Sequence, residues 1–184
     1  MTTRPDDGMP LGRKIALVIS LAAAIVCADL GTKSVFERAF FGQPTLHLLG
    51  DTVRVGFVLN TGVFLSLGHT LGPQTRFWLF IVGVGGVLAL LLGLTLKDAR
   101  FRTPEVASVA AIIGGGVGNL VDRVQLGAVR DFLNVGIGPL RTGIFNVADM
   151  AITFGGIALI LIPFLRKRPG GAGHSGGGEA TPRA

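Results

Sequence analysis

The sequence FWLFIVGVGGVLALLLGLTL, residues 77–96, is an apolar stretch without a single charged side chain. A helix needs about 20 mostly apolar residues to cross the hydrocarbon core of a bilayer, which is roughly 30 Å thick. The stretch therefore predicts a membrane-spanning helix.

Three other stretches approach the same length, at about residues 15–36, 106–121 and 145–165. Each of them contains or ends at a carboxylate, which an ordinary span avoids. We predict an all-α membrane protein in which four transmembrane helices form a single domain over residues 1–168.

The composition of the 184-residue chain supports this class. Hydrophobic residues make up 49% of the chain and charged residues only 15%, and the mean hydropathy is +0.61. Soluble domains carry about 25% charged residues, so the composition argues against a soluble enzyme. One Cys and three His leave no disulfide framework and no metal-ligand spacing, so we expect no metal and no cofactor. The Gly-rich residues 169–184 predict a disordered tail.

The basic residues indicate how the chain is oriented. Four crossings place both termini on one side, and clusters of Lys and Arg mark the cytoplasmic side. The net charge of +6 is thereby explained as an orientation signal, and we expect no nucleic-acid partner. Both termini and the tail are predicted to be cytoplasmic. The clusters are Arg4, Arg13 and Lys14; Lys97, Arg100 and Arg102; and Arg166, Lys167 and Arg168.

The first span also has an alternative interpretation as a cleaved signal peptide, with Cys27 as a lipid-modified residue. Against this, Val26 stands where a small residue is expected, and residues 29–36 continue the helical pattern. We favour an uncleaved first helix.

The segments on the outer side have β-strand character. In residues 43–68, Val53, Val55, Phe57 and Leu59 alternate with other side chains, after a turn signal at Gly50-Asp51. Residues 128–135 form a second such run. We expect a small β-sheet that rests on the outer membrane surface.

Three acids reach a similar depth on three different helices. With a rise of about 1.5 Å per residue, Asp29 lies about 22 Å along the first span and Asp122 about 26 Å along the third. Asp149 lies about one turn below the outer surface, because its helix runs in the opposite direction. The glycines before Asp122 allow close helix packing, which favours convergence of these acids at the outer interface.

Asp122 and Asp149 are the pair to which we assign chemistry. Two nearby carboxylates share a proton, so that one can activate water while the other protonates the leaving amine. Asn119 and Asn146 precede them by three residues and can orient them. Each acid also has a structural alternative, as an interfacial ion pair with Arg123 or as a helix-dipole partner.

Asp29 and Lys33 have the i,i+4 spacing of a helical salt bridge, and we interpret this pair as structural, with Lys33 extending outward. A proton relay in a transporter and a purely structural membrane factor remain alternative functions. A presenilin-like protease would require Gly-x-Gly-Asp, whereas Gly118 is followed by Asn119.

The sequence resembles the lipoprotein signal peptidase (signal peptidase II) family of bacterial inner-membrane aspartic proteases, over about residues 13–165. Five motifs in order carry the resemblance. They are DLGTK (29–33), NTGVF (60–64), GGGVGNLVDR (114–123), VRDF (129–132) and FNVAD (145–149). Two flanking positions depart from the family, since Gly116 and Val63 stand where Ala is common.

The resemblance implies a membrane aspartic endopeptidase that cleaves diacylglyceryl-modified prolipoproteins just before the lipidated Cys, with its active site near the periplasmic face. It implies inhibition by globomycin-type peptides and contact with membrane lipid. The catalytic pair is Asp122 and Asp149, the supporting residues are Asn119, Asn146 and Ala148, and the residues for substrate or inhibitor binding are Asn60, Gly62, Arg123, Asp29 and Lys33. Asp131 falls on a family acid that we interpret as structural.

Overall fold

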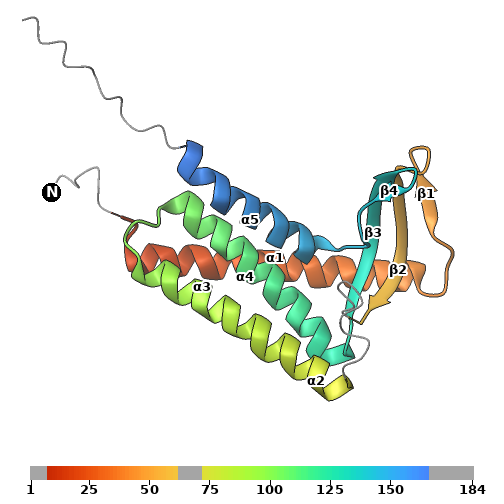
Figure 1. Cartoon of the computed structure of the whole chain (residues 1–184), viewed down its shortest axis with the longest axis horizontal. Helices are drawn as coiled ribbons and strands as arrows, with labels where there is room; N and C mark the ends of the chain where they lie inside the picture. The colour runs from red at the N-terminus through yellow and green to blue at the C-terminus, as the bar shows by residue number, and fades with distance from the viewer. Residues whose placement is uncertain (1–7, 62–71, 166–184) are drawn as a thin grey trace, which may run out of the picture.

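The computed structural model describes residues 8–61 and 72–165. Its helical part consists of α1 (Leu11–Phe40), α4 (Thr103–Leu126), α5 (Val147–Leu165) and a consecutive helical run. The run comprises α2 (Pro73–Trp78), the π-helical turn η2 (Leu79–Val84) and α3 (Gly85–Lys97). The long helices lie side by side in one bundle (Figure 1).

The helices agree with the four predicted apolar stretches. Three of them, α1, α4 and α5, are long and apolar enough to cross a membrane, and a shorter apolar helix covers Ile81–Lys97. Helix α1 exceeds its predicted end at residue 36 by one turn. It runs without a break through Cys27, whose side chain is exposed.

Helix α4 is packed against α1, α3 and α5, and its glycines explain how. A Cβ on Gly114 would lie 3.0 Å from backbone atoms of Ala22 in α1, and one on Gly115 would lie 2.4 Å from the carbonyl oxygen of Ala148 in α5. Neither position has room for a side chain. The predicted close approach of helices at this Gly-rich stretch is confirmed.

The strands form one antiparallel sheet in the order β1-β2-β3-β4. Their bounds are β1 (Leu46–Leu48), β2 (Val53–Asn60), β3 (Val129–Ile137) and β4 (Leu140–Arg141). Both predicted β regions are therefore present as strands. The part of the first region at residues 62–68 lies outside the described residues.

The sheet lies across one end of the bundle, with β3 leading from α4 and returning toward α5 (Figure 1). Phe36 of α1 stacks on Phe132 of β3, with ring centroids 4.1 Å apart. Because α1 continues beyond the predicted span, it reaches the sheet and packs against β3 through this pair of rings. This contact fixes the strand that carries Arg130 and Asp131.

The opposite end of the bundle is closed by a buried lysine. Lys14 is 2% exposed, and its ammonium donates to the carbonyl oxygens of Thr95 at 3.0 Å and Asp98 at 2.7 Å. These carbonyls belong to the C-terminal end of α3, which lacks helical donors of its own. Lys14 thereby joins α1 to α3.

Candidate active site

A buried cluster of charges connects α1, α4 and β3. Lys33 donates to Asp29 Oδ2 at 2.6 Å and to Asn119 Oδ1 at 3.0 Å, and its Nζ lies 3.1 Å from Asp122 Oδ2. An ammonium group has three donors, and all three are engaged. The salt bridge predicted between Asp29 and Lys33 is confirmed. The prediction that Lys33 extends outward is wrong, because these acceptors hold it inside, with 0% exposure.

Asp122 is surrounded by cationic and backbone donors. Arg130 contacts Oδ1 through Nη2 at 2.6 Å and Nε at 3.1 Å, and its backbone N–H donates to Oδ2 at 3.0 Å. With Lys33 also on Oδ2, four donors meet the roughly four lone-pair sites of a carboxylate. Asp122 is fully buried and has no lone pair left for a water molecule.

Asp29 connects α1 to the start of α5. Its Oδ1 accepts the backbone N–H of Ala148 at 2.9 Å, one of the N-terminal donors that α5 cannot satisfy internally. A Cβ on Gly118 would lie 2.5 Å from Asp29 Oδ2, so this contact requires a glycine in α4. The charged cluster therefore holds three helices and a strand together.

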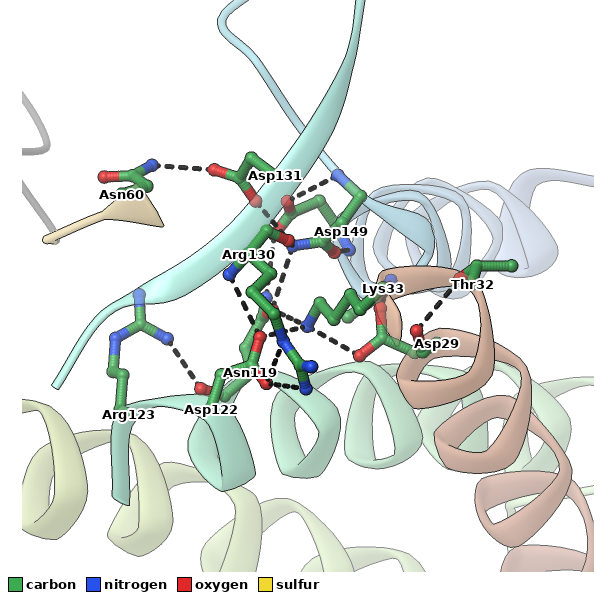
Figure 2. A network of polar contacts seen from close by, with 12 residues as sticks. Asp29, Thr32, Lys33, Asn60, Asn119, Asp122, Arg123, Arg130, Asp131 and Asp149 are labelled. Carbon is green, nitrogen blue, oxygen red and sulfur yellow. Dashed lines mark hydrogen bonds and ion pairs between the residues drawn. The ribbon is translucent and has the colours of Figure 1, made fainter. Parts of the chain in front are cut away.

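A cavity of about 980 Å³ lies on the other side of this cluster. Its charged and amide side chains come from β2, α4, β3 and α5: Asn60, Asn119, Arg123, Asp131 and Asp149. Its apolar lining comes from β2, β3, the segment before α5 and α5 itself: Val58, Leu59, Val129, Ile144, Phe145, Met150 and Phe154. Figure 2 shows Asn60 and Asp131 pointing toward one another above the helix ends.

Asp149 lies in the first turn of α5, where it forms a reciprocal cap with Asn146. The backbone N–H of Asp149 donates to Asn146 Oδ1 at 3.0 Å, and that of Asn146 donates to Asp149 Oδ2 at 3.1 Å. This arrangement is a capping box, which fixes both side chains at a helix N-terminus. The remaining oxygen of Asp149 accepts from Asn119 Nδ2 at 2.8 Å. Two acceptor sites of Asp149 are thus used, half of its capacity.

Asp131 is the second acid of the cavity. Its oxygens accept from Asn60 Nδ2 at 2.9 Å and from Asn146 Nδ2 at 2.6 Å. Burial raises the pKa of Asp131 to about 6, against the opposing hydrogen bond from Asn60, and the nearby charge of Asp149 raises it further. Asn146 contacts both acids, one through its side chain and the other through its backbone.

Asn119 connects the charged cluster to the cavity. Its Oδ1 accepts from Lys33 and from Asn146 Nδ2, the latter at 3.1 Å, while its Nδ2 donates to Asp149. Lys33 thereby dictates the orientation of the amide, because only the oxygen can face an ammonium group. The amide nitrogen is left to face Asp149. Both Asn119 and Asn146 thus contact Asp149, and the role predicted for them in orienting Asp122 and Asp149 stays a prediction.

The predicted binding residues are divided between the two regions. Asn60 and Arg123 line the cavity. Asp29 and Lys33 are 0% exposed inside the cluster, and their predicted contact with substrate stays a prediction. Ala148 is also fully buried, beneath Asp149, and Gly62 lies outside the described residues.

Two neighbouring residues of β3 take important positions. Asp131, interpreted from the sequence as structural, lines the cavity, and Arg130 forms an ion pair with Asp122. The alternation of side chains along a strand was the available signal, because it sends neighbours to opposite faces of β3. Within residues 8–61 and 72–165, no three His, Cys, Asp or Glu side chains are grouped so that they could hold a metal ion.

Comparison with known proteins agrees with the motifs. The sequence profile described as signal peptidase (SPase) II, Peptidase_A8, matches residues 21–165. The chain belongs to the signal peptidase II family. Its activity is therefore that of a lipoprotein signal peptidase, the cleavage of prolipoprotein signal peptides, and its catalytic class is that of the aspartic peptidases. It is a multi-pass bacterial membrane protein.

Individual relatives cover most of the chain. The lipoprotein signal peptidase of Sulfurihydrogenibium sp. is 34% identical over 82% of this chain and 92% of its own length. That of Nitratidesulfovibrio vulgaris is 34% identical over 86% and 96%, and that of Streptomyces griseus is 29% identical over 94% and 87%. A solved bacterial membrane enzyme is similar in fold, with a TM-score of 0.71 and 24% identity over 90% of this chain and 100% of that chain.

Proposed function

We propose that this family member cleaves its substrate with Asp131 and Asp149 as the catalytic pair. The observation that carries the proposal is their shared environment: both line one cavity, both contact Asn146, and both keep about half of their acceptor sites available. Asp122 lacks this property, because Lys33 and Arg130 occupy its oxygens.

The chemistry follows from the different surroundings of the two acids. Asp131, whose pKa is raised to about 6 chiefly by burial, holds the shared proton and hydrogen-bonds the substrate carbonyl oxygen. Asp149 remains ionised and takes a proton from the attacking water. The proton on Asp131 then reaches the leaving amine. The two acids end with their protonation states exchanged.

In this proposal Asp122 is a positioning residue. It binds both the backbone and the guanidinium of Arg130, and Asp131 is the next residue of β3. The pairing of Asp122 with Asp149 inferred from the sequence remains a prediction. The experiment below separates the two pairings.

We assign the substrate a position along α5. Met150 and Phe154 continue the cavity wall one turn and two turns from the start of α5, which gives an apolar surface for a signal peptide beside its lipid chains. The substrate is a diacylglyceryl-modified prolipoprotein cut before its lipidated Cys. Asn60 and Arg123 line the same cavity and would contact the polypeptide, and a globomycin-type peptide would compete there.

The membrane arrangement is also part of the proposal. The consecutive helices α2, η2 and α3 form the fourth span, since residues 73–97 give a helical length of about 37 Å. The basic residues Lys14, Lys97 and Arg100 favour a cytoplasmic location of the opposite end. The cavity and the sheet then face the periplasm, in the bacterial inner membrane.

The experiment is a cleavage assay on a lipidated precursor peptide, with three Asp→Asn variants measured side by side. We expect Asp131→Asn and Asp149→Asn each to lower kcat at least about a thousandfold, because each removes one partner of acid–base catalysis. Asp149→Asn should keep the wild-type Tm within a few degrees, and Asp131→Asn should not lower it, because it removes a buried carboxylate whose ionisation is unfavourable. A globomycin-type peptide should still bind both variants, with a Kd measured by calorimetry.

Asp122→Asn should give the opposite profile. It leaves Lys33 and Arg130 underneutralised, which costs about 3–5 kcal/mol in a buried pair, so the Tm should fall while cleavage persists below that temperature. Full activity of Asp131→Asn together with loss of all cleavage in a stable Asp122→Asn protein would refute the proposed pair and support the sequence-based one.

A further inference from the structure

Two turns at one end of the sheet carry exposed aliphatic side chains. We call residues 48–52 and 137–140 the paired turns. Leu49 is 79% exposed, Ile137 78% and Leu140 82%, and these values are among the highest of the large apolar side chains outside the helices. The turns are not the polar tips that hairpins in water favour.

The paired turns form one unit. The backbone N–H of Gly136 donates to the carbonyl oxygen of Thr52 at 2.9 Å. Arg141 donates through Nη1 to the carbonyl oxygen of Asp51 at 2.7 Å. These hydrogen bonds join the two turns to each other at the end of β2 and β3. Leu49, Ile137 and Leu140 therefore lie at the same edge of the sheet.

The backbone of the first turn adds a second observation. Leu49 has φ 50°, and Gly50 and Asp51 follow with φ 62° and 69°. A left-handed conformation is unfavourable for leucine, and Asn or Gly would be the usual residue there. The carbonyl oxygen of Leu49 accepts from the backbone N–H of Thr52 at 3.2 Å, which closes the turn, while its side chain is exposed. A residue held in an unfavourable backbone conformation with an exposed apolar side chain points to a function for that side chain.

The level of the sheet relative to the bilayer can be obtained from α1. Phe36, which stacks on Phe132 of β3, is 22 residues after the buried Lys14, which corresponds to about 33 Å of helix. The sheet therefore begins just beyond a hydrocarbon core of roughly 30 Å, at the depth of the lipid headgroups. In Figure 1 the end of the sheet with the paired turns extends past α5, beyond the helical bundle.

Charges directly behind the paired turns fit the same depth. Arg54 and Arg141 both interact with Asp51, with Arg54 Nη2 at 2.5 Å from Asp51 Oδ2, and His47 contacts the same carboxylate. Two guanidinium groups face a single acid, so the edge has a net positive charge. Cationic groups next to exposed aliphatic side chains are the combination found in proteins that lie in the membrane interface.

We propose that the paired turns are a lipid-contact site, in which Leu49, Ile137 and Leu140 insert between the headgroups of the outer leaflet. Arg54 and Arg141 lie at the level of the lipid phosphates behind them. The inserted edge holds the sheet, and with it Asp131, at a fixed height above the bilayer. The inference uses the orientation assumed in the proposed function, but it requires no catalytic residue.

The test uses tryptophan as a depth reporter in nanodiscs of phosphatidylcholine and phosphatidylglycerol. Trp78 is the single tryptophan of the chain, so Trp78→Phe supplies a silent background. Leu49→Trp and Leu140→Trp are introduced separately in that background. Gln43→Trp, at the opposite end of β1, serves as the reference for a side chain in water. Retained cleavage of the lipidated peptide shows that each variant is folded.

We expect the emission at positions 49 and 140 to shift to the blue and to lose intensity when the lipids carry bromine near the headgroup, while iodide in the buffer has little effect. Position 43 should respond to iodide and not to bromine. Equal quenching of all three variants by iodide, without any response to brominated lipid, would overturn the proposal. Because no substrate is present in the quenching measurement, that result would leave the proposed catalytic pair untouched.

Discussion

At the scale of single residues, the site shows how identical side chains acquire different chemistry from their partners. Asp122 and Asp149 lie near each other along the bundle, yet Asp122 receives two cations and Asp149 receives two uncharged N–H groups. A carboxylate with all lone pairs engaged acts as a structural anion, whereas one with lone pairs available can bind water. In the proposed mechanism, the distribution of donors therefore distinguishes the catalytic acids from Asp122.

The raised pKa of Asp131 gives a pH-dependent prediction. Its usual value is 3.8 and its value in the folded protein is about 6, so the folded state binds this proton more tightly than the unfolded chain does. Ionised Asp131 then destabilises the fold above pH 6 by up to about 3 kcal/mol, and this cost disappears below pH 4. Asp131→Asn removes it, so the Tm difference, variant minus wild type, should decrease as the pH falls from 8 to 4, as measured by scanning calorimetry in detergent.

Asp98→Asn is the matched control for that measurement. Arg100 lowers the pKa of Asp98 to about 2, so Asp98 stabilises the fold above pH 3.8 and loses this contribution only in stronger acid. Its Tm difference from wild type should stay constant between pH 8 and pH 5. A Tm difference for Asp131→Asn that is equally constant would show that Asp131 does not titrate in this range.

The sequence identified most of the polar residues of the site, and the pairing of Asp122 with Asp149 that it suggested stays a prediction. The rise per residue places Asp122 at the correct level, but it says nothing of what lies around the carboxylate. Arg130 reaches Asp122 because Gly127, with φ 69°, ends α4 and turns the chain back toward it. That return is a tertiary contact, which local spacing does not encode.

At the scale of elements, α4 organises the bundle because its small residues face three different neighbours. Gly114 contacts α1, Gly115 contacts α5, and Gly116 contacts Leu88 of α3. The helices were predictable, since length and apolar composition identify spans without knowledge of their partners. The ends of the helices were harder to predict. Helix α1 extends to Phe40, where it supports the sheet through Phe36, and no hydropathy pattern indicates that contact.

A comparison of two glycines tests this packing. Gly118→Ala would place a Cβ 2.5 Å from Asp29 Oδ2, a carboxylate held by Lys33 and by the N-terminus of α5. We expect a loss of about 1–3 kcal/mol of unfolding free energy, typical of overpacking at a fixed group, together with reduced cleavage. Denaturation of the purified protein in mixed micelles measures it.

Gly116→Ala is the matched substitution on the same helix. Its Cβ would meet the methyl groups of Leu88 at 2.7 Å, and these lie at the end of a flexible side chain. The effect on the midpoint should be clearly smaller than that of Gly118→Ala. The reverse order would mean that the carboxylate of Asp29 can move and that the cluster is not rigid.

At the scale of the whole molecule, a polar site is separated from the opposite end of the bundle by apolar packing. Val18, Val106 and Ala110 form the core between them, and Lys14 closes the far end. The sheet covers the end that holds the cavity. The candidate site thus lies at one end of the bundle, as the proposed orientation requires.

A reporter fusion tests that orientation. A phosphatase that is active only in the periplasm, fused after Lys97, should be inactive, because this link joins α3 to α4 at the basic end of the bundle. The same reporter inserted at Gly50 in the sheet should be active. High activity after Lys97 and none at Gly50 would reverse the proposed topology.

The salt bridge between Asp29 and Lys33 has a consequence for biogenesis. The two residues are four positions apart on α1, and their 2.6 Å contact is made entirely within that helix. A nascent first span can therefore cancel its own charges before α4 and α5 have been synthesised, and it enters the bilayer as an electrically neutral segment. Asp122 and Asn119 belong to α4, which is synthesised later, and they then pack against Lys33 of the inserted first helix.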